Sequence, residues 1–244
     1  MTTRIAAMLG ATGGAGTTRL SVETAALLAA TGRDVAVFDA AFQTQGLASY
    51  TEQRIETDVT KVLTSETELE AALYDQSGEF PGRLAFCPAW APFERLARAK
   101  TAGAANRLEQ QLSAAAISHD IVLVDTPPIG GNQAIAAVNA ADRIAVVTPD
   151  SRRGRDGLAV TRERLADIGL ATDAVIANRS TENVIEADAY VPEIESTNPG
   201  DAPACIPTAE PLTPAIAAVI ERTLGIDIEI ETPDSGRLSG LIGS

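Results

Sequence analysis

Short apolar runs that alternate with helical segments constrain the fold of this chain more than any other feature. Each run spans three to six residues and is apolar at successive positions, which is typical of strands buried in a parallel sheet. Because helical spacing of apolar residues lies between the runs, we predict a three-layer α/β fold with a mainly parallel sheet and helices on both faces. The predicted strands are residues 5–10, 35–38, 84–87, 121–124, 144–147 and 175–177.

The segments between these strands predict the remaining organisation. The predicted helices are residues 17–31, 57–74 (as one or two short helices), 93–117, 133–140, 157–168 and 214–224. Residues 181–203 are polar and contain prolines, which indicates irregular structure, and Ile206-Pro207 is predicted to end a late strand. We therefore predict one domain over residues 1–224 and a tail over residues 225–244.

Charge narrows the range of partners. The chain has 33 acidic and 19 basic residues, which gives a formal net charge of −14. Binding to DNA irrespective of its sequence requires a basic surface, so no nucleic-acid partner is expected. Lys61 and Lys100 are the only lysines, and this scarcity with abundant acid resembles the composition of proteins from salt-loving archaea. An ordinary acidic cytosolic protein is the alternative.

The remaining composition bears on the compartment. Cys87 and Cys205 are the only cysteines, too few for a disulfide framework or a cysteine-rich zinc site, and both are expected in the core. No apolar run approaches the length of a membrane-spanning helix. The N-terminus lacks the charged, apolar and small-residue regions of a signal peptide. We therefore expect a cytoplasmic protein.

Polar residues follow three of the predicted strands, at Asp39, Asp125 and Asn178. In open parallel sheets, ligands bind outside the carboxyl ends of the strands, so these residues mark the expected site. A glycine-rich loop over residues 10–18 joins the first strand to the first helix at the same edge. Successive N–H groups in such a loop and the start of a helix attract anions. A plain tight turn capped by Thr17 or Thr18 is the alternative.

These motifs together resemble the MinD/ParA family of P-loop ATPases over about residues 4–224. The family's deviant Walker A motif, Lys-Gly-Gly-x-Gly-Lys-Thr-Thr, corresponds to Thr12–Arg19. Its switch II motif, Asp-x-Pro-Pro, is matched by Asp125–Pro128, and its Asn-Arg pair on the adenine side is matched by Asn178-Arg179. The late Ile-Pro motif is matched by Ile206-Pro207.

The resemblance implies a P-loop NTPase fold and a site for ATP or ADP with Mg²⁺. The nucleotide-binding residues that it implies are Gly13, Gly14, Ala15, Gly16, Thr17, Thr18, Asn178, Arg179 and Pro207. Three groups are implied to serve the metal, namely Thr18, Asp39 and Asp125. The loop keeps its backbone N–H donors, so weak nucleotide binding is expected. Complete loss of nucleotide binding is the alternative.

Three departures from the family pattern bear on catalysis. The signature lysine is Thr12, the Walker lysine is Thr17, and the second switch I aspartate is Ala41. Because cations act mainly on the transition state of phosphoryl transfer, we expect little or no ATP hydrolysis and assign no catalytic residue. Arg19 is expected on the helix surface rather than as a replacement for the lysine.

The resemblance and its departures leave three functional hypotheses. The first choice is a spatial-organisation protein, for cell division, chromosome, motility or cell-shape positioning, with a degenerate nucleotide site. An active ATP-dependent switch of the same family is the alternative, and a metabolic P-loop enzyme ranks third. Because Thr12 is short and uncharged, an ATP-driven homodimer is not expected. A protein partner is expected instead, with an intact MinD/ParA-family protein as one candidate.

Two further surfaces carry alternatives. The cluster of Arg152, Arg153 and Arg155 either contacts an acidic partner or anion, or pairs with the chain's own carboxylates. In the tail, Leu238, Leu241 and Ile242 fall on one helical face and resemble a minimal form of the membrane tip of MinD proteins. One such tip gives at most weak peripheral contact with the inner face of the cell membrane, and a frayed tail is the alternative.

Overall fold

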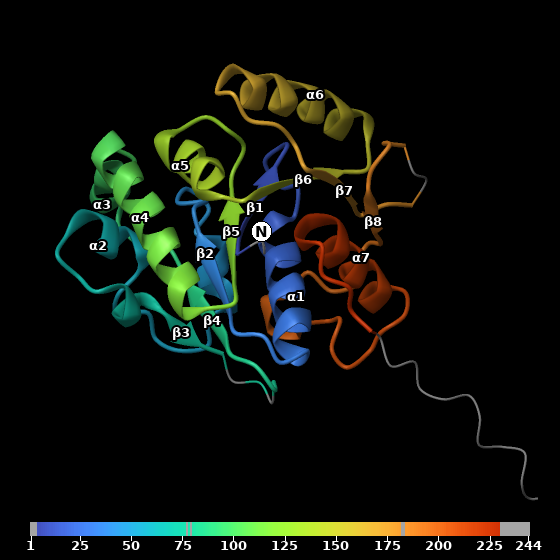
Figure 1. Ribbon diagram of the computed structural model, residues 1–244, viewed down its shortest axis with the longest axis horizontal. Helices are drawn as coiled ribbons and strands as arrows, with labels where there is room; N and C mark the ends of the chain where they lie inside the picture. The colour runs from blue at the N-terminus through green and yellow to red at the C-terminus, as the bar shows by residue number, and fades with distance from the viewer. Residues whose placement is uncertain (1–3, 77, 79, 182–183, 230–244) are drawn as a thin grey trace, which may run out of the picture.

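The fold is built on one eight-stranded sheet, as seen in a computed structural model that describes residues 4–76, 78, 80–181 and 184–229. The strands lie in the order β3-β4-β2-β5-β1-β6-β7-β8, and all pairs are parallel except β3 with β4 (Figure 1). Their bounds are β1 Ile5–Gly10, β2 Val35–Asp39, β3 Tyr74–Asp75, β4 Leu84–Cys87, β5 Ile121–Thr126, β6 Arg143–Pro149, β7 Ala174–Asn178 and β8 Ala189–Val191.

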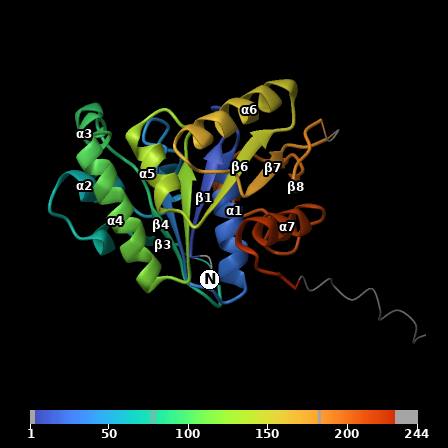
Figure 2. The same ribbon diagram turned by 45° about the horizontal axis from the view of Figure 1, so that its top comes forward.

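Helices cover both faces of this sheet, as Figures 1 and 2 show, so the predicted three-layer α/β fold is confirmed. The α-helices are α1 Thr17–Ala30, α2 Val59–Thr64, α3 Phe93–Ala99, α4 Ala102–Ser118, α5 Asn132–Ala140, α6 Arg152–Asp167 and α7 Leu212–Leu224. Three short 3-10 helices complete the described part: η1 Gly46–Tyr50, η2 Leu69–Ala72 and η3 Pro199–Asp201.

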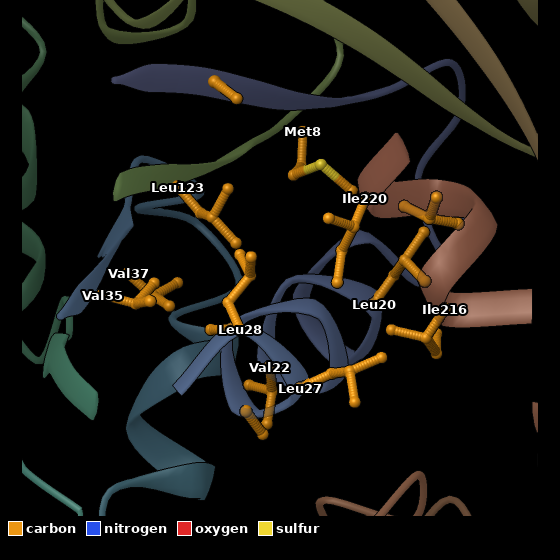
Figure 3. Packing of buried hydrophobic residues seen from close by; sticks show 14 of the residues in the cluster. Met8, Leu20, Val22, Leu27, Leu28, Val35, Val37, Leu123, Ile216 and Ile220 are labelled. Carbon is orange, nitrogen blue, oxygen red and sulfur yellow. The ribbon is translucent and has the colours of Figure 1, made fainter. Parts of the chain in front are cut away.

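Successive side chains along each strand point to opposite faces of the sheet, so the apolar core lies in two layers. Met8 and Leu123 point to the face covered by α1 and α7, where they pack with Leu28 and Ile220 (Figure 3). The neighbouring strand residues point to the opposite face, where α2 to α6 cover two further apolar clusters. Because both faces are buried, the central strands are apolar at successive positions up to the polar residues at their carboxyl ends, as the sequence predicts.

Several predicted boundaries are wrong. The predicted helix over residues 93–117 is two helices, because Thr101 caps α4 by accepting a hydrogen bond from the N–H of Ala104. Helix α6 begins at Arg152 rather than residue 157, because Ser151 caps it in the same way. The structure adds the edge strands β3 and β8, which are too short to leave an apolar pattern. No strand ends at Ile206-Pro207.

The isolated cysteines and histidine take structural places. Cys87 and Cys205 are buried and free, and they belong to apolar clusters on opposite faces of the sheet. His119 is buried at the end of α4, where its ring lies within hydrogen-bonding distance of Ser118 and the carbonyl of Ala115. Within the part of the chain that the structure describes, no helix is long and apolar enough to cross a membrane.

The centre of the core provides a test of the fold. Leu123 on β5 has no exposed surface, so Leu123→Ala should lower the free energy of unfolding by about 2–5 kcal/mol through lost burial and a residual cavity. The matched control is Ile117→Ala, because Ile117 is 84% exposed and its truncation should change that free energy by no more than about 0.5 kcal/mol. Urea denaturation followed by circular dichroism measures both. Equal losses in the two variants would contradict the placement of β5.

Candidate functional site

The candidate site lies at the carboxyl ends of the central strands, where the loops after β1, β2, β5 and β7 meet. A cavity of about 330 Å³ opens beside the start of α1. Its wall is formed by the glycine loop, η1, the end of β7 and the segment 193–199. Of the predicted nucleotide-binding residues, Gly16, Thr18, Asn178 and Arg179 lie on this wall.

The glycine loop has the backbone geometry of an anion nest. Gly14 and Gly16 have φ angles of 77° and 86°, in the left-handed region that favours glycine. A Cβ atom at Gly16 would also lie 2.4 Å from Asn178 Nδ2, so the loop approaches the end of β7 too closely for a side chain. Gly13 and Gly14 are exposed at the outer turn, and Ala15 is buried beneath it. The loop therefore supplies backbone N–H groups from its outer turn and from the first turn of α1.

The two positions of the family's lysines are occupied by threonines that contact the protein itself. The side chain of Thr17 lies close enough to Asp125 to lower the pKa of that carboxyl, and its Cγ2 atom would lie 3.5 Å from a Cβ atom at Gly10. Thr12 lies against α6, where a Cβ atom at Gly157 would be 2.4 Å from Thr12 Cγ2. Neither side chain carries charge, so the loop holds no cation at either position.

Arg19 is the nearest cation on α1, but its guanidinium group is already engaged. Its Nε atom forms a 2.6 Å ion pair with Glu23, and its Nη atoms lie 3.3–3.4 Å from the carbonyl oxygens of Ser196, Asn198 and Asp201. Glu23 is fully buried and also accepts the N–H groups of two residues in the 196–205 segment. Arg19 therefore anchors one wall of the cavity, and its side chain is only 12% exposed, so, contrary to the prediction, it does not lie on the open surface of α1.

Two carboxylates lie side by side at the floor of the site. Asp39 on β2 and Asp125 on β5 are partners in the sheet register, and both are fully buried. Thr18 donates its hydroxyl to Asp125 Oδ2 at 2.6 Å. The backbone N–H of Ala41 donates to Asp39 Oδ1 at 2.8 Å. The three residues predicted from the sequence to serve the metal, Thr18, Asp39 and Asp125, therefore lie together in the structure.

Burial of this pair changes its protonation. Burial, and then the negative charge of Asp125, raises the pKa of Asp39 to about 8. Burial also raises the pKa of Asp125 to about 6, although hydrogen bonds from Thr18 and Thr17 oppose the shift. The pair therefore holds a proton at neutral pH unless a cation compensates its charge.

The same pair fits a magnesium ion that retains other ligands. Asp125 Oδ1 is buried and has no hydrogen-bond partner in the described structure, although the other oxygen accepts from Thr18. Mg²⁺ is usually held by one or two carboxylates together with water and phosphate oxygens. No cluster of three or more His, Cys, Asp or Glu residues suited to a metal occurs among the described residues. The donor set thus suits Mg²⁺ that arrives with a phosphate ligand.

The other end of the cavity carries the predicted base-binding residues. Asn178 closes β7 and donates through Nδ2 to the carbonyl of Ala15 at 2.9 Å, which joins β7 to the glycine loop. Arg179 has a φ angle of 56°, an uncommon conformation for a residue with a side chain. The structure does not place Pro207 among the residues of this wall, and Pro207 is exposed.

Other wall residues were not predicted from the sequence. A Cβ atom at Gly46 would lie 2.9 Å from Thr18 Oγ1, so this glycine lets η1 approach the first turn of α1. Tyr50 and Ile194 add apolar surface. No motif marks these residues, although the Arg19 and Glu23 pair could have been found from its i,i+4 spacing on α1.

The arginine cluster separates into two parts at the start of α6. Arg155 donates to the carbonyl of Val184 at 2.6 Å. Arg152 and Arg153 are exposed in the first turn, and neither forms an ion pair with a carboxylate in the described part of the chain. The alternative of pairing with the chain's own acids is therefore not seen for these residues. The tail residues Leu238, Leu241 and Ile242 lie outside the described residues.

Comparison with known proteins agrees with this geometry. A family model described as an AAA domain matches residues 3–175. An uncharacterised ATP-binding protein of Methanocaldococcus jannaschii is 31% identical over 188 residues, which cover 75% of this chain and 68% of that protein. The chain therefore belongs to this family of ATP-binding domains, and within it to the MinD/ParA family of P-loop ATPases.

Solved structures share the fold at lower identity. A chain of the MinC:MinD cell division protein complex of Aquifex aeolicus superimposes with a TM-score of 0.75 and 21% identity, covering 94% of this chain and 98% of that one. A cobyrinic acid a,c-diamide synthase of Mycobacterium smegmatis, with bound ADP and magnesium, gives 0.67 and 20%, covering 95% and 100%. The fold alone thus occurs in both a cell division protein and a synthase.

The buried carboxylates predict a pH dependence of stability. The native pKa of Asp39 lies above its ordinary value of 3.8, so its unfavourable effect on stability is absent below about pH 4 and grows until about pH 8. Asp39→Asn removes this effect. The gain in Tm from the substitution should therefore be larger at pH 8.5 than at pH 5 by about 3 °C or more, or ~1 kcal/mol.

Thermal unfolding without Mg²⁺ measures this difference. Asp167→Asn is the control, because Asp167 is exposed near the end of α6 and its replacement removes one negative charge away from the site. A gain for Asp39→Asn that is the same at both pH values would show that Asp39 is ionised throughout.

Proposed function

We propose that this chain is a MinD/ParA-type spatial-organisation protein that binds Mg²⁺-ATP or Mg²⁺-ADP weakly and hydrolyses ATP slowly or not at all. One observation carries the proposal. The loop has glycines in the left-handed conformation of an anion nest, but threonines that contact the protein fill both lysine positions, and Arg19 on α1 is bound to Glu23.

Nucleotide binding and ATP hydrolysis depend on different groups of the site. The backbone N–H groups and the start of α1 favour phosphate binding without any lysine. Thr18, Asp39 and Asp125 would hold the metal, and bound Mg²⁺ would neutralise part of the phosphate charge. Phosphoryl transfer depends on cations that stabilise the transition state, and a finger-type cation contributes about a thousandfold or more. The loss of two lysines therefore affects hydrolysis more than binding.

The residue at the family's second switch I position also supports slow or absent ATP hydrolysis. Ala41 takes the position of the family's second switch I aspartate, and this residue is only 7% exposed. Its N–H group holds Asp39 rather than positioning a water molecule. No carboxylate is therefore offered by this residue as a general base. An active ATP-dependent switch is the alternative, and the intact group of Thr18, Asp39 and Asp125 favours it.

A known complex and an exposed arginine pair bear on the kind of partner. The relative of known structure was solved as a MinC:MinD complex, so a protein of this fold does bind a different protein. We propose that this chain also acts through a different protein, with an intact relative of its own family as one candidate. The exposed pair Arg152 and Arg153 is a second candidate contact for an acidic partner.

Restoring the Walker lysine tests the nucleotide site. Thr17→Lys should tighten the binding of Mg²⁺-ATP by about 1.5–3 kcal/mol, or about 10- to 150-fold in Kd, by adding a charge-assisted hydrogen bond. Thr31→Lys adds the same charge at the far end of α1 and should leave Kd unchanged. Isothermal titration calorimetry measures both variants and the wild type.

Hydrolysis is measured on the same proteins by phosphate release. The wild type should release phosphate no faster than a sample without protein. Turnover that Thr18→Ala abolishes would establish the active switch instead. The absence of nucleotide binding in both the wild type and Thr17→Lys would remove the nucleotide from the proposal.

Measuring self-association tests whether ATP joins two copies of this chain. Thr12 cannot span to a second subunit, and the net charge of −14 opposes the approach of like subunits. The molar mass in solution should therefore not change when ATP and Mg²⁺ are added. Light scattering in 0.15 M and 1 M KCl checks this, because the higher salt screens repulsion beyond about 3 Å. A doubling of mass that requires ATP would contradict the prediction.

A further inference from the structure

An exposed aromatic surface lies next to the candidate site but outside its cavity. Residues 88–93, here termed the 88–93 loop, follow β4 and lead into α3. The side chains of Trp90 and Phe93 are 59% and 85% exposed. Trp90 is the only tryptophan in the sequence, and it is absent from the wall of the 330 Å³ cavity. A separate hollow of about 630 Å³ lies beside Trp90.

Gln45 fastens this loop to the segment that follows Asp39. Its Oε1 atom accepts the N–H of Ala91 at 2.9 Å, and its Nε2 atom donates to the carbonyl of the same residue at 3.3 Å. Gln45 adopts φ 51°, in the left-handed region where a residue with a side chain is strained. The two hydrogen bonds to Ala91 offset this strain. Gly46, the next residue, lies on the wall of the cavity against Thr18.

Asp39 contacts both the segment that follows β2 and the residues that precede Trp90. Its carboxylate accepts the N–H of Ala41 at 2.8 Å and that of Leu47 at 3.4 Å, so it brackets Gln45 on both sides. The N–H of Ala89 also faces Asp39 and lowers the pKa of its carboxyl. The buried carboxylate of Asp39 therefore interacts with the residue before Trp90.

The far side of the 88–93 loop is fixed to the body of the protein. Arg95 on α3 pairs with the buried Asp58, and the same Nη2 atom donates to the carbonyl of Trp90 at 3.0 Å. Helices α2 and α3 lie next to each other at this edge of the molecule (Figure 1). The loop thus has one side anchored on α2 and α3, and one side anchored on Asp39 and Gln45.

We propose that Asp39 and Gln45 transmit the occupancy of the nucleotide site to the 88–93 loop, so that the Trp90 and Phe93 surface changes when Mg²⁺-nucleotide binds. A cation, or the water that it carries, competes for the Asp39 oxygens that hold Ala41, Leu47 and Ala89. The ligand therefore interacts differently with the two arrangements of these segments, which is the requirement for a shift between them. This inference rests on the proposed nucleotide binding.

Trp90 fluorescence tests the inference directly, because no other tryptophan contributes. Addition of Mg²⁺-ADP should change the emission of the wild type, with a midpoint that matches the Kd measured by calorimetry. Gln45→Ala removes both bonds to Ala91 and should reduce the change at least about threefold, with Kd altered by no more than about threefold. Gln45→Gly removes the same bonds without backbone strain, in case the alanine variant does not fold.

The matched control is Gln53→Ala. Gln53 is exposed whereas Gln45 is half-buried, but its amide also donates to a backbone carbonyl, that of Asp75, and the variant should keep the full fluorescence change. Binding without a change in Trp90 emission, or a change that survives both Gln45 variants, would overturn this inference and leave the proposed function intact. The absence of binding by calorimetry in the wild type and in Thr17→Lys would overturn the proposed nucleotide binding, and this inference with it.

Discussion

The buried pair of Asp39 and Asp125 is the interaction on which the rest of the site depends. Adjacent parallel strands end with these two carboxylates in register, where no solvent reaches either side chain. Their charge has to be offset by hydrogen bonds, by protons or by a cation. Thr18 and the backbone around Ala41 supply the hydrogen bonds, which draws the start of α1 and the segment after β2 against the sheet edge.

A second buried carboxylate organises the opposite wall. Glu23 has no exposed surface, and it accepts bonds from Arg19 and from the backbone of Ala204 and Cys205. Withdrawal of Arg19 toward a ligand would leave Glu23 without its cation in the interior. The wall over the cavity is held without any ligand.

These contacts hold the glycine loop and the strand ends together although the loop contains no lysine. The lysine positions are filled by threonines with internal contacts, so the loop keeps its form without the charge. The carboxylates remain because they tie together three loops, whether or not hydrolysis takes place. The proposed link to Trp90 would give nucleotide binding an effect on the surface.

The sequence by itself determined the class of fold, the glycine loop and the polar residues at the strand ends. These features follow local rules, since apolar runs, helical spacing and glycine preferences act over a few residues. It could not predict the short strand β8, which is held by pairing rather than by an apolar pattern. Nor could it predict that Pro207 lies off the cavity wall or that Gln45 bonds to Ala91, 46 residues away. Only the tertiary structure decided those contacts, because they depend on how distant loops pack against the same sheet edge.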